Sequence, residues 1–301
     1  MRSAHALRLL ALAPLAATSI ASLACLAPRH AAEPGGDTAA PPEISTSTPF
    51  TGDKFMWPPG KKAAVTLTYD DALTSQLDHA VPALTDHHLR ATFFLTEAAR
   101  NDTDRWKALL KRGHELAAHT MLHPCDGAQS WVKKGNSLQD YDAKRMDAEL
   151  EENIGLLKSL GVNKGPLTFA YPCGSTWIGQ SAESYTPLVK KHFLAARGTA
   201  STYAYPDTEQ FENAPAVSGD KSGPELVQLV EGAVADGAWL IVMFHGVGGD
   251  FLTVATDAHE ALLTYLERHK ETIWTDTFVR VSSYVMSHRP PAAQADAGGG
   301  G

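Results

Sequence analysis

Short apolar runs that alternate with helical patterns are the feature of this sequence that most restricts its fold. Seven runs have the length of β-strands, and they span residues 64–69, 91–95, 115–118, 167–171, 193–196, 239–244 and 278–281. Between them, apolar residues recur at helical spacing within 146–157, 226–234 and 261–266. Strands that alternate with helices favour a parallel sheet, so the sequence predicts an α/β protein with a distorted or incomplete (β/α) barrel of about seven parallel strands.

The first 32 residues have the pattern of a secretory signal peptide. Two arginines precede an uncharged stretch of Leu and Ala (residues 9–26), which small residues follow. The alternative is a membrane-spanning helix, but the stretch is Ala-rich and has no stop-transfer flank. Residues 22–25 (SLAC) loosely resemble a lipoprotein signal, which would anchor the chain through Cys25. We expect an exported protein, periplasmic or secreted, with no transmembrane span after cleavage.

Two further segments have the composition of unstructured chain. Residues 33–50 are rich in Pro, Gly, Ser and Thr and predict a flexible linker, and residues 289–301 (RPPAAQADAGGGG) predict a disordered tail. The part between them, 51–288, contains no internal repeat and is long enough for one domain with a substantial core. We therefore expect a single catalytic domain.

The charge balance excludes one class of partner. Cleavage after residue 32 removes three arginines and no acidic residue, so a net charge of −8 becomes −11, with 23 basic and 34 acidic residues. Nucleic-acid binding needs Lys and Arg to contact phosphates, so nucleic acid is not an expected partner. Cys125 and Cys173 then remain, and two cysteines in an exported protein can form a disulfide.

A pair of acidic residues, Asp70 and Asp71, ends the first predicted strand. Two adjacent carboxylates repel each other and are costly to bury, which a nearby cation would relieve. The alternative is that one of them caps a following helix, since Asp is common at the N-terminus of helices.

Two histidines follow the third predicted strand. His119 and His123 are four residues apart, so one helical turn would place both imidazoles on the same side, as a metal ion requires. Two imidazoles with one carboxylate leave coordination positions free for water and substrate. Such a set is typical of a catalytic rather than a structural metal site.

Two more clusters lie at predicted strand ends. Residues 171–174 (YPCG) form a sharp turn that could expose a backbone N–H to a developing oxyanion, although an ordinary turn is by itself the better explanation. His245 follows the continuous apolar run 239–244, which is typical of a strand buried on both faces. A histidine in this place suits proton donation to a leaving group, or else a structural hydrogen bond.

In their order and spacing, the four clusters resemble the polysaccharide deacetylases, also called the NodB-homology group or carbohydrate esterase family four. The resemblance covers about residues 61–285. It implies that Asp71, His119 and His123 bind a divalent metal, most commonly zinc. It further implies that Asp70 is the general base and that His245 protonates the departing amine or alcohol.

The resemblance also implies roles around the third cluster. The backbone N–H of Cys173 would hold the oxyanion, with Tyr171 beside it in the same turn, and Trp177 would stack on a sugar face unless it is a core or surface residue. Apolar residues near His245, for which Val242 and Phe244 are candidates, would receive the acetyl methyl group.

The sequence departs from the family's pattern at the third cluster. Where the family usually has an arginine that orients the base there is Ala170, and where it has an aromatic residue there is Cys173. We predict that Arg197, near the next strand end, replaces the missing arginine; a surface arginine is the alternative. The carboxylate that usually tunes the histidine acid has two weak candidates, Asp207 and Asp250.

Within this picture Cys125, two residues after His123, and Cys173, in the oxyanion turn, would lie close together. We predict a disulfide that ties the two catalytic loops to each other. If unstrained it would stabilise the fold by about 2 to 4 kcal/mol.

The resemblance thus implies a metal-dependent hydrolase that removes N- or O-linked acetyl groups from a carbohydrate such as a chitin-like chain, peptidoglycan or acetylated xylan. One alternative is a catalytically silent carbohydrate-binding protein on the same fold. Asp70 and His245 argue against it, because sugar binding alone needs neither. A second alternative is a hydrolase of a non-glycan amide, against which the predicted export argues. The sequence does not indicate the oligomeric state.

Overall fold

A computed structural model describes residues 55–289, which form an α/β unit around one parallel sheet. The strands of the sheet follow the order β7-β4-β3-β2-β1-β9-β8, and β10 pairs with the first residues of β1 beside β2. All of these pairs are parallel, so the predicted fold class is confirmed. The strands are β1 (Ala63–Asp70), β2 (Thr92–Leu95), β3 (Glu115–Ala118), β4 (Thr168–Ala170), β7 (Ala195–Arg197), β8 (Val217–Ser218), β9 (Trp239–Phe244) and β10 (Ile273–Thr275).

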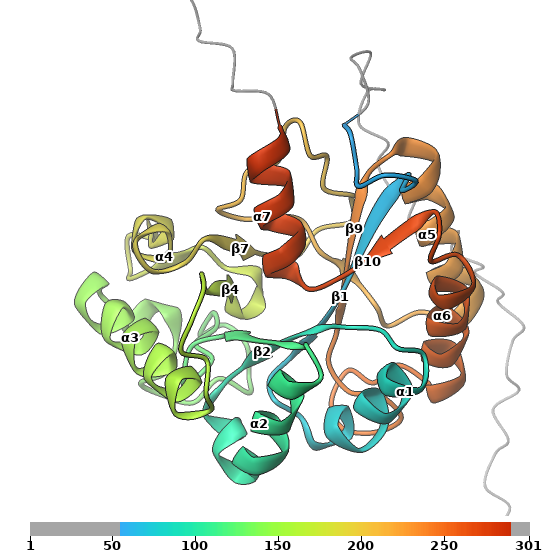
Figure 1. Cartoon of the computed structure of the whole chain (residues 1–301). Coiled ribbons are helices and arrows are strands. Elements are labelled where there is room, and N and C mark those ends of the chain that lie inside the picture. Colours follow the sequence, from blue (N-terminus) through green and yellow to red (C-terminus); the bar gives the residue numbers. More distant parts are fainter. Residues whose placement is uncertain (1–54, 290–301) are drawn as a thin grey trace, which may run out of the picture. The chain divides into compact units, whose positions relative to one another are not determined.

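Helices connect the successive strands of the sheet, except β7 and β8, as the alternating sequence pattern predicts (Figure 1). They are α1 (Val81–Asp86), α2 (Thr103–Lys111), α3 (Ala143–Ser159), α4 (Thr186–His192), α5 (Gly223–Asp236), α6 (Thr256–Arg268) and α7 (Phe278–His288). Short helical turns are η1 (Gln76–Ala80), η2 (Glu97–Asp102), η3 (Leu138–Asp140) and η4 (Pro172–Gly174), and a separate antiparallel pair is β5 (Trp177–Ile178) with β6 (Glu183–Ser184). The three helices predicted from apolar spacing correspond to α3, α5 and α6.

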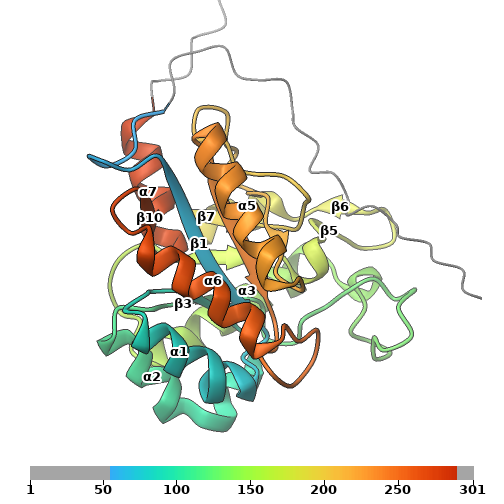
Figure 2. The ribbon, with the colours of Figure 1, turned by 90° about the vertical axis from the view of Figure 1, so that its right-hand side faces the viewer.

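The sheet is covered on both faces, as the burial of its central strand shows. All eight residues of β1 are buried. Alternate residues of the strands, Leu67 among them, pack in the larger core cluster, which includes apolar residues of α1 to α6. The residues between them, such as Ala64, face a second cluster that contains Val281 and Val285 of α7. Figure 1 shows α7 on the other side of β1 from α5 and α6, and Figure 2 shows α1, α6 and α5 side by side along the sheet.

One predicted strand, 278–281, is wrong, because these residues begin α7. The first amides of the helix are held by side chains from the sheet: the Phe278 N–H donates to Thr92 Oγ1 (2.8 Å) and the Val279 N–H to Glu115 Oε2 (2.9 Å). The strand in this region is β10, and the two-residue strand β8 was not predicted. A four-residue apolar run fits a strand and the first turn of a buried helix equally well.

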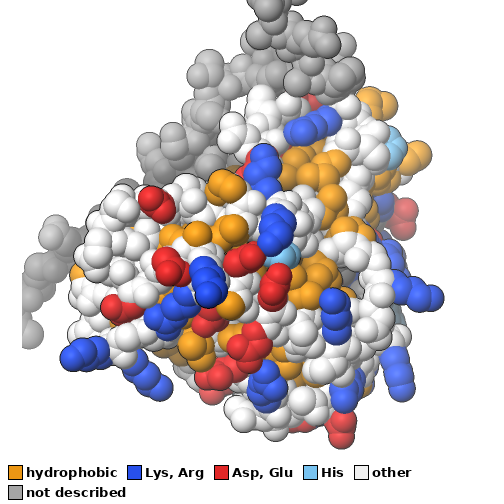
Figure 3. Space-filling view, turned by 90° about the vertical axis from the view of Figure 1, so that its left-hand side faces the viewer, with side chains coloured by type: hydrophobic (Ala, Val, Ile, Leu, Met, Phe, Trp, Pro, Cys, Tyr) orange, Lys and Arg blue, Asp and Glu red, His pale blue; other side chains and the backbone are white. Residues whose placement is uncertain are grey.

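The helical face formed by α3 and α4 carries both signs of charge. Figure 3 shows acidic and basic side chains interspersed there with apolar ones, and ion pairs join some of them, such as Lys191 with Asp147 (3.0 Å) and Lys190 with Glu212 (2.7 Å). Among residues 55–289, none of the helices is both long and apolar enough to cross a lipid bilayer. The predicted signal peptide (1–32) with Cys25, the linker (33–50) and the tail beyond Arg289 lie outside the described residues.

Candidate functional site

The parallel strands bring the polar clusters of the sequence to one edge of the sheet. Asp70 is the last residue of β1, Arg197 the last of β7, and His119 and His245 follow β3 and β9 directly. Neighbouring parallel strands end on the same side, so side chains from distant segments meet there. His119, His123 and His245 each place a ring nitrogen within ion-pair distance of Asp71.

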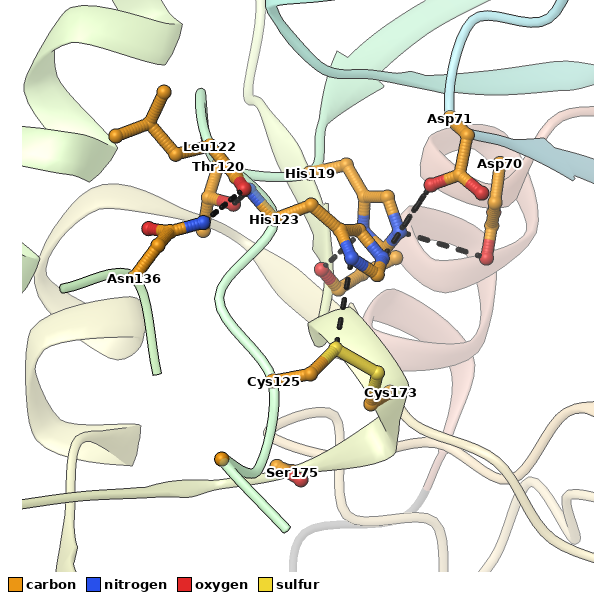
Figure 4. The surroundings of a disulfide bond; sticks show 12 residues. Asp70, Asp71, His119, Thr120, Leu122, His123, Cys125, Asn136, Cys173 and Ser175 are labelled. Atoms are coloured by element: carbon orange, nitrogen blue, oxygen red, sulfur yellow. Dashed lines mark hydrogen bonds and ion pairs between the residues drawn. A yellow bond between two sulfur atoms is a disulfide. The ribbon is translucent and has the colours of Figure 1, made fainter. Parts of the chain in front are cut away.

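Asp71, His119 and His123 form the centre of the site (Figure 4). Asp71 Oδ1 lies 3.5 Å from His119 Nε2 and 3.4 Å from His123 Nε2. This oxygen is buried and has no hydrogen-bond partner within residues 55–289. Burial of a carboxylate oxygen without a partner destabilises the folded state. A cation or a hydrogen-bond donor between these three groups would remove this cost.

Hydrogen bonds fix the His119 ring with one nitrogen directed at Asp71. The Nδ1–H donates to the carbonyl of Ala170 (2.8 Å), which leaves the lone pair on Nε2. Burial lowers the pKa of His119 to about 3, so the imidazole is neutral at physiological pH. A neutral histidine whose second nitrogen is held by a carbonyl is the usual form of a metal ligand.

The loop between the two histidines differs from the predicted helical turn. Thr120 and His123 have positive φ angles of 59° and 50°, so residues 119–123 turn back sharply instead of forming a helix. Two side chains of α3 hold the turn. Glu149 accepts hydrogen bonds from the backbone N–H groups of the two residues before His123 (2.9 and 3.1 Å). Asn153 accepts a hydrogen bond from the backbone N–H of His119 (3.0 Å). The ring centroids of the histidines are 4.8 Å apart. The predicted proximity therefore arises from a loop held by α3.

Arg197 holds Asp70 in place. Its Nη2 donates to Asp70 Oδ1, and its guanidinium lies over the Phe94 ring, 4.6 Å from the centroid. Arg197 is fully buried, which rules out a surface arginine. Burial alone would raise the pKa of Asp70, but the charge of Arg197 and its hydrogen bond outweigh this effect and lower the pKa below its usual value. Asp70 is thus ionised, with Oδ2 3.8 Å from His119 Nε2.

The pKa of Asp71 is shifted in the opposite direction to that of Asp70. Burial and the nearby charge of Asp70 raise the pKa of Asp71 to about 6. Arg197 balances the charge of Asp70, so the ionised Asp71 beside two neutral imidazoles leaves the site with an uncompensated negative charge. The donor set of one carboxylate and two imidazoles, with an unpartnered oxygen between them, fits a divalent metal ion.

The destabilising charge of Asp71 can be tested in metal-free protein. In chelator-treated protein at pH 7.5 we expect Asp71→Asn to be more stable than the wild type by about 2 to 3 kcal/mol, from about 1.4 kcal/mol per pKa unit. Because the folded-state pKa of Asp71 is raised, the destabilisation is complete above this pKa and disappears as the pH falls toward 4, and the difference between the two proteins should shrink accordingly. Asparagine tolerates the positive φ of residue 71 (76°).

Urea unfolding at pH 4 to 8 measures this difference, with Asp86→Asn as control because Asp86 is exposed at the end of α1. Equal stability of wild type and Asp71→Asn at every pH would contradict the electrostatic reading. Added zinc should reverse the order, since binding to the folded state stabilises the wild type.

His245 lies across from the histidine pair. Its Nε2 is 3.9 Å from Asp71 Oδ2, and Gln76 Nε2 donates to its backbone carbonyl (3.0 Å). Of the two carboxylates considered as its partner, Asp250 accepts the Ser75 N–H (2.6 Å), and Asp207 lines a separate cavity beside the start of β7. Asp71, already a candidate ligand, is therefore the carboxylate that the structure brings to His245.

The predicted disulfide between Cys125 and Cys173 is present, with the Cα atoms 5.9 Å apart. Cys173 lies in η4 with a φ of 54°, in a turn next to the end of β4. Cys125 Sγ is 3.5 Å from His123 Nδ1, so the disulfide contacts a candidate metal ligand directly. It joins the histidine loop to the predicted oxyanion turn.

Four residues near this turn and β9 lie in positions that do not fit the substrate contacts considered for them. Val242 and Phe244 are buried in the larger core, and Phe244 stacks on Tyr69, so neither is available to an acetyl methyl group. The Tyr171 ring is likewise buried. Trp177, the first residue of β5, is half-buried and packs against the core. A strand buried on both faces gives no alternation in sequence from which to tell which side chains face the site.

Two exposed aromatic residues beside the site were not predicted. Trp131 is 56% exposed with its ring 6.4 Å from that of His123, and Phe251 is 58% exposed with its ring 6.0 Å from that of His245. In the sequence both stand out only as single large aromatics in polar or Gly-rich loops, 126–137 and 246–252. Trp131 thus lies beside a candidate metal ligand, and Phe251 lies beside the predicted acid His245.

Comparisons with known proteins agree with the predicted resemblance. The family model for polysaccharide deacetylase matches residues 58–188, which include both aspartates and both histidines of the site. A crystal structure of a putative polysaccharide deacetylase from Mycobacterium smegmatis superposes with a TM-score of 0.57 at 14% identity, covering 82% of this chain and 98% of that one. The resemblance is therefore confirmed, and the structural likeness shows the shared fold.

Two more relatives are similar over most of the chain. The catalytic domain of a peptidoglycan N-acetylglucosamine deacetylase from Eubacterium rectale has a TM-score of 0.49 at 19% identity, over 76% of this chain and 94% of that one. A gellan lyase from Bacillus sp is 24% identical over 257 residues, which are 76% of this chain and 10% of that protein. The chain thus spans about a tenth of the length of this curated relative.

Proposed function

We propose that this chain, which matches the polysaccharide deacetylase family over residues 58–188, is a metal-dependent hydrolase that removes acetyl groups from a carbohydrate. The observation that carries the proposal is the unpartnered Asp71 Oδ1, buried between the Nε2 atoms of His119 and His123. A catalytically silent binding protein has no need of that strained arrangement. The charged Asp70–Arg197 pair beside it, which hydrolysis uses and sugar binding does not, supports the same conclusion.

Asp71, His119 and His123 would hold the metal, and zinc is the ion we propose because two imidazoles and one carboxylate are common zinc ligands. When bound, the ion would polarise the acetyl carbonyl and lower the pKa of a neighbouring water. The chain's own residues perform the proton transfers. Asp70 takes the water proton on Oδ2, because Arg197 occupies Oδ1 and keeps the carboxylate ionised.

Attack of the water oxygen on the acetyl carbon places negative charge on the acetyl oxygen. We assign the backbone N–H of Cys173 as a donor to this charge, since its turn is held beside His123 by the disulfide. His245 then gives a proton to the departing nitrogen or oxygen as its bond to the acetyl carbon breaks, and acetate is released. Its position across from Asp71 supports this role, because a proton donor is needed on the side of the leaving group.

The exposed aromatic residues beside the site support a carbohydrate as the substrate class. Trp131 presents an exposed ring beside His123 and Phe251 one beside His245, and aromatic rings pack well against the apolar faces of sugars. We place the substrate polymer across these rings, in the envelope or outside the cell. This location depends on the predicted signal peptide.

The rings lead to a specific expectation for binding. Trp131→Ala should raise KM about tenfold or more for an oligosaccharide, with kcat changed far less, since a lost stacking contact of about 1.4 kcal/mol is uniform binding energy. Trp131→Phe should keep most of the affinity, and Met56→Ala, an exposed apolar residue at the start of the described chain, serves as control. Steady-state kinetics on an acetylated oligosaccharide decides this, and an unchanged KM in Trp131→Ala would remove Trp131 from the binding surface.

The function itself is tested by acetate release from chitin oligomers, peptidoglycan and acetylated xylan, each with added zinc and with a chelator. We expect release from at least one glycan, abolished by the chelator and restored by zinc. Binding of a glycan without acetate release would favour the silent binding protein. Release that the chelator leaves unaffected would contradict metal dependence.

A further inference from the structure

The disulfide and the candidate metal centre share one imidazole. His123 directs Nε2 at Asp71 Oδ1 (3.4 Å) and Nδ1 at Cys125 Sγ (3.5 Å). Figure 4 shows the disulfide on one side of the His123 ring and the two aspartates on the other. The Sγ atoms of Cys125 and Cys173 and a ring nitrogen of His123 all lie within 4.8 Å of one another, which is close enough for a common ion.

We propose that reduction of this disulfide creates a second metal site, formed by Cys125, Cys173 and His123 Nδ1, that competes with the Asp71 site for a divalent ion. While the disulfide is intact, neither sulfur is a thiolate and only the Asp71 site exists. The inference goes beyond the proposed function, with which it shares the Asp71 site and His123. Its consequence is a deacetylase centre that assembles only in the oxidised protein.

The two sites exclude each other because of the chemistry of a single imidazole. A neutral histidine carries one proton and one lone pair on its two ring nitrogens. Binding through Nε2 beside Asp71 requires the proton on Nδ1, whereas binding through Nδ1 beside the sulfurs requires it on Nε2. An ion at the sulfur site would therefore remove His123 from the set that includes Asp71 and His119.

Ligand preference favours the sulfur site once it exists. Thiolates are softer and stronger ligands for zinc than a carboxylate, and two thiolates with one imidazole form a common zinc donor set. The ion would have to move only from one edge of the His123 ring to the other. No change in the fold is needed for this transfer.

Backbone hydrogen bonds keep the two cysteines in place when the covalent bond is absent. The Leu138 N–H donates to the Cys125 carbonyl (2.8 Å), which fixes this residue against η3. The Gly174 N–H donates to the Tyr171 carbonyl (2.9 Å) and preserves the turn that carries Cys173. Reduction should therefore leave both thiols near His123.

The exposure of the two sulfurs determines the course of reduction. Cys173 is exposed and Cys125 is buried, so a thiolate of an external dithiol attacks Cys173 Sγ and Cys125 leaves as a thiolate. The second thiolate of the dithiol then attacks the mixed disulfide and releases Cys173. The dithiol becomes a cyclic or intramolecular disulfide and the protein gains two electrons. Each cysteine takes a proton from solvent and returns it when its thiolate binds the metal.

Cobalt(II) is a suitable probe, because sulfur ligation produces an intense charge-transfer band in the near ultraviolet that oxygen and nitrogen ligands do not. The full chain is titrated with Co²⁺ under anaerobic conditions, once oxidised and once after reduction with a dithiol and desalting. We expect no sulfur band in the oxidised protein. The reduced protein should show the band and bind Co²⁺ about tenfold more tightly or more, as thiolates replace a carboxylate.

Three variants assign the ligands. Cys125→Ser with Cys173→Ser should bind Co²⁺ without the band under both conditions. Asp71→Asn should lose binding when oxidised but show the band when reduced, so this inference can hold even if the proposed deacetylase site fails. His123→Ala should weaken binding in the reduced state about tenfold or more.

Three results would overturn the proposal. The first is a reduced protein whose Co²⁺ spectrum and affinity equal those of the oxidised form. The second is a sulfur band of unchanged affinity in His123→Ala. The far-ultraviolet circular dichroism of the reduced protein should match that of the oxidised protein, and a band seen only after loss of this spectrum would also contradict the proposal.

Discussion

Replacing Asp70 with asparagine should lower kcat for acetate release by about 10²- to 10⁴-fold, the usual contribution of a general base. Asp70 is the ionised carboxylate next to the candidate ligands, and Arg197 leaves only its Oδ2 available for a proton. The amide of asparagine keeps the shape of the side chain but cannot accept this proton. Steady-state rates with saturating zinc, on the glycan found to be the substrate, measure the effect.

Metal affinity is the internal control for this variant. Asp70 is outside the proposed ligand set, so zinc should bind Asp70→Asn within about tenfold of the wild-type affinity. Residual activity should rise with pH, because hydroxide partly replaces the missing base. A variant with normal zinc binding and more than about a tenth of the wild-type kcat would show that another group takes the proton.

Arg197→Met should produce a second large effect, on both stability and the pH profile. Removal of one partner of a buried ion pair leaves the other charge uncompensated, which costs about 3 to 5 kcal/mol. Arg197 is fully buried and donates to Asp70, and within residues 55–289 no other Lys or Arg forms an ion pair with Asp70 or Asp71. Chemical unfolding in urea should show the loss, and Asp70→Asn/Arg197→Met should recover much of it because neither charge then remains.

The pH profile separates a positioning role of Arg197 from a purely structural one. The Arg197 charge lowers the pKa of Asp70 against the effect of burial, so its removal should raise that pKa. The acidic limb of the kcat/KM profile should therefore move to higher pH, and activity lost at pH 6 should return in part at pH 8. Arg197→Lys, which keeps the charge, should shift the limb less. An unchanged profile in Arg197→Met would mean that Arg197 acts only on stability.

The convergence of the site could be predicted because each cluster ends a strand of a parallel sheet. Asp70 ends β1 and His245 follows β9, which pairs with β1. Arg197 ends the strand next to β4, where the family's usual arginine is replaced by alanine. Topology, which the alternating apolar pattern indicates, accounts for the convergence of the strand ends. The choice of Arg197 and the pairing of Cys125 with Cys173 depended in addition on the resemblance to the polysaccharide deacetylases.

Features that depend on side chains from other elements could not be predicted. The turn between His119 and His123 is held by Glu149 and Asn153 of α3, so its form cannot be read from spacing alone. The start of α7 depends on Glu115, which lies 164 residues earlier in the chain. The exposed rings near the site belong to irregular loops, where sequence has no period to indicate direction.

The most direct test of the account is the position of a bound metal ion. Anomalous diffraction at the zinc edge, from crystals of the oxidised protein grown with zinc, should give one strong peak about 2.0 to 2.2 Å from an Asp71 oxygen and from the Nε2 atoms of His119 and His123. The peak should be absent from crystals of Asp71→Asn. Zinc located away from these three side chains, or an undisturbed peak in the variant, would contradict the central claim.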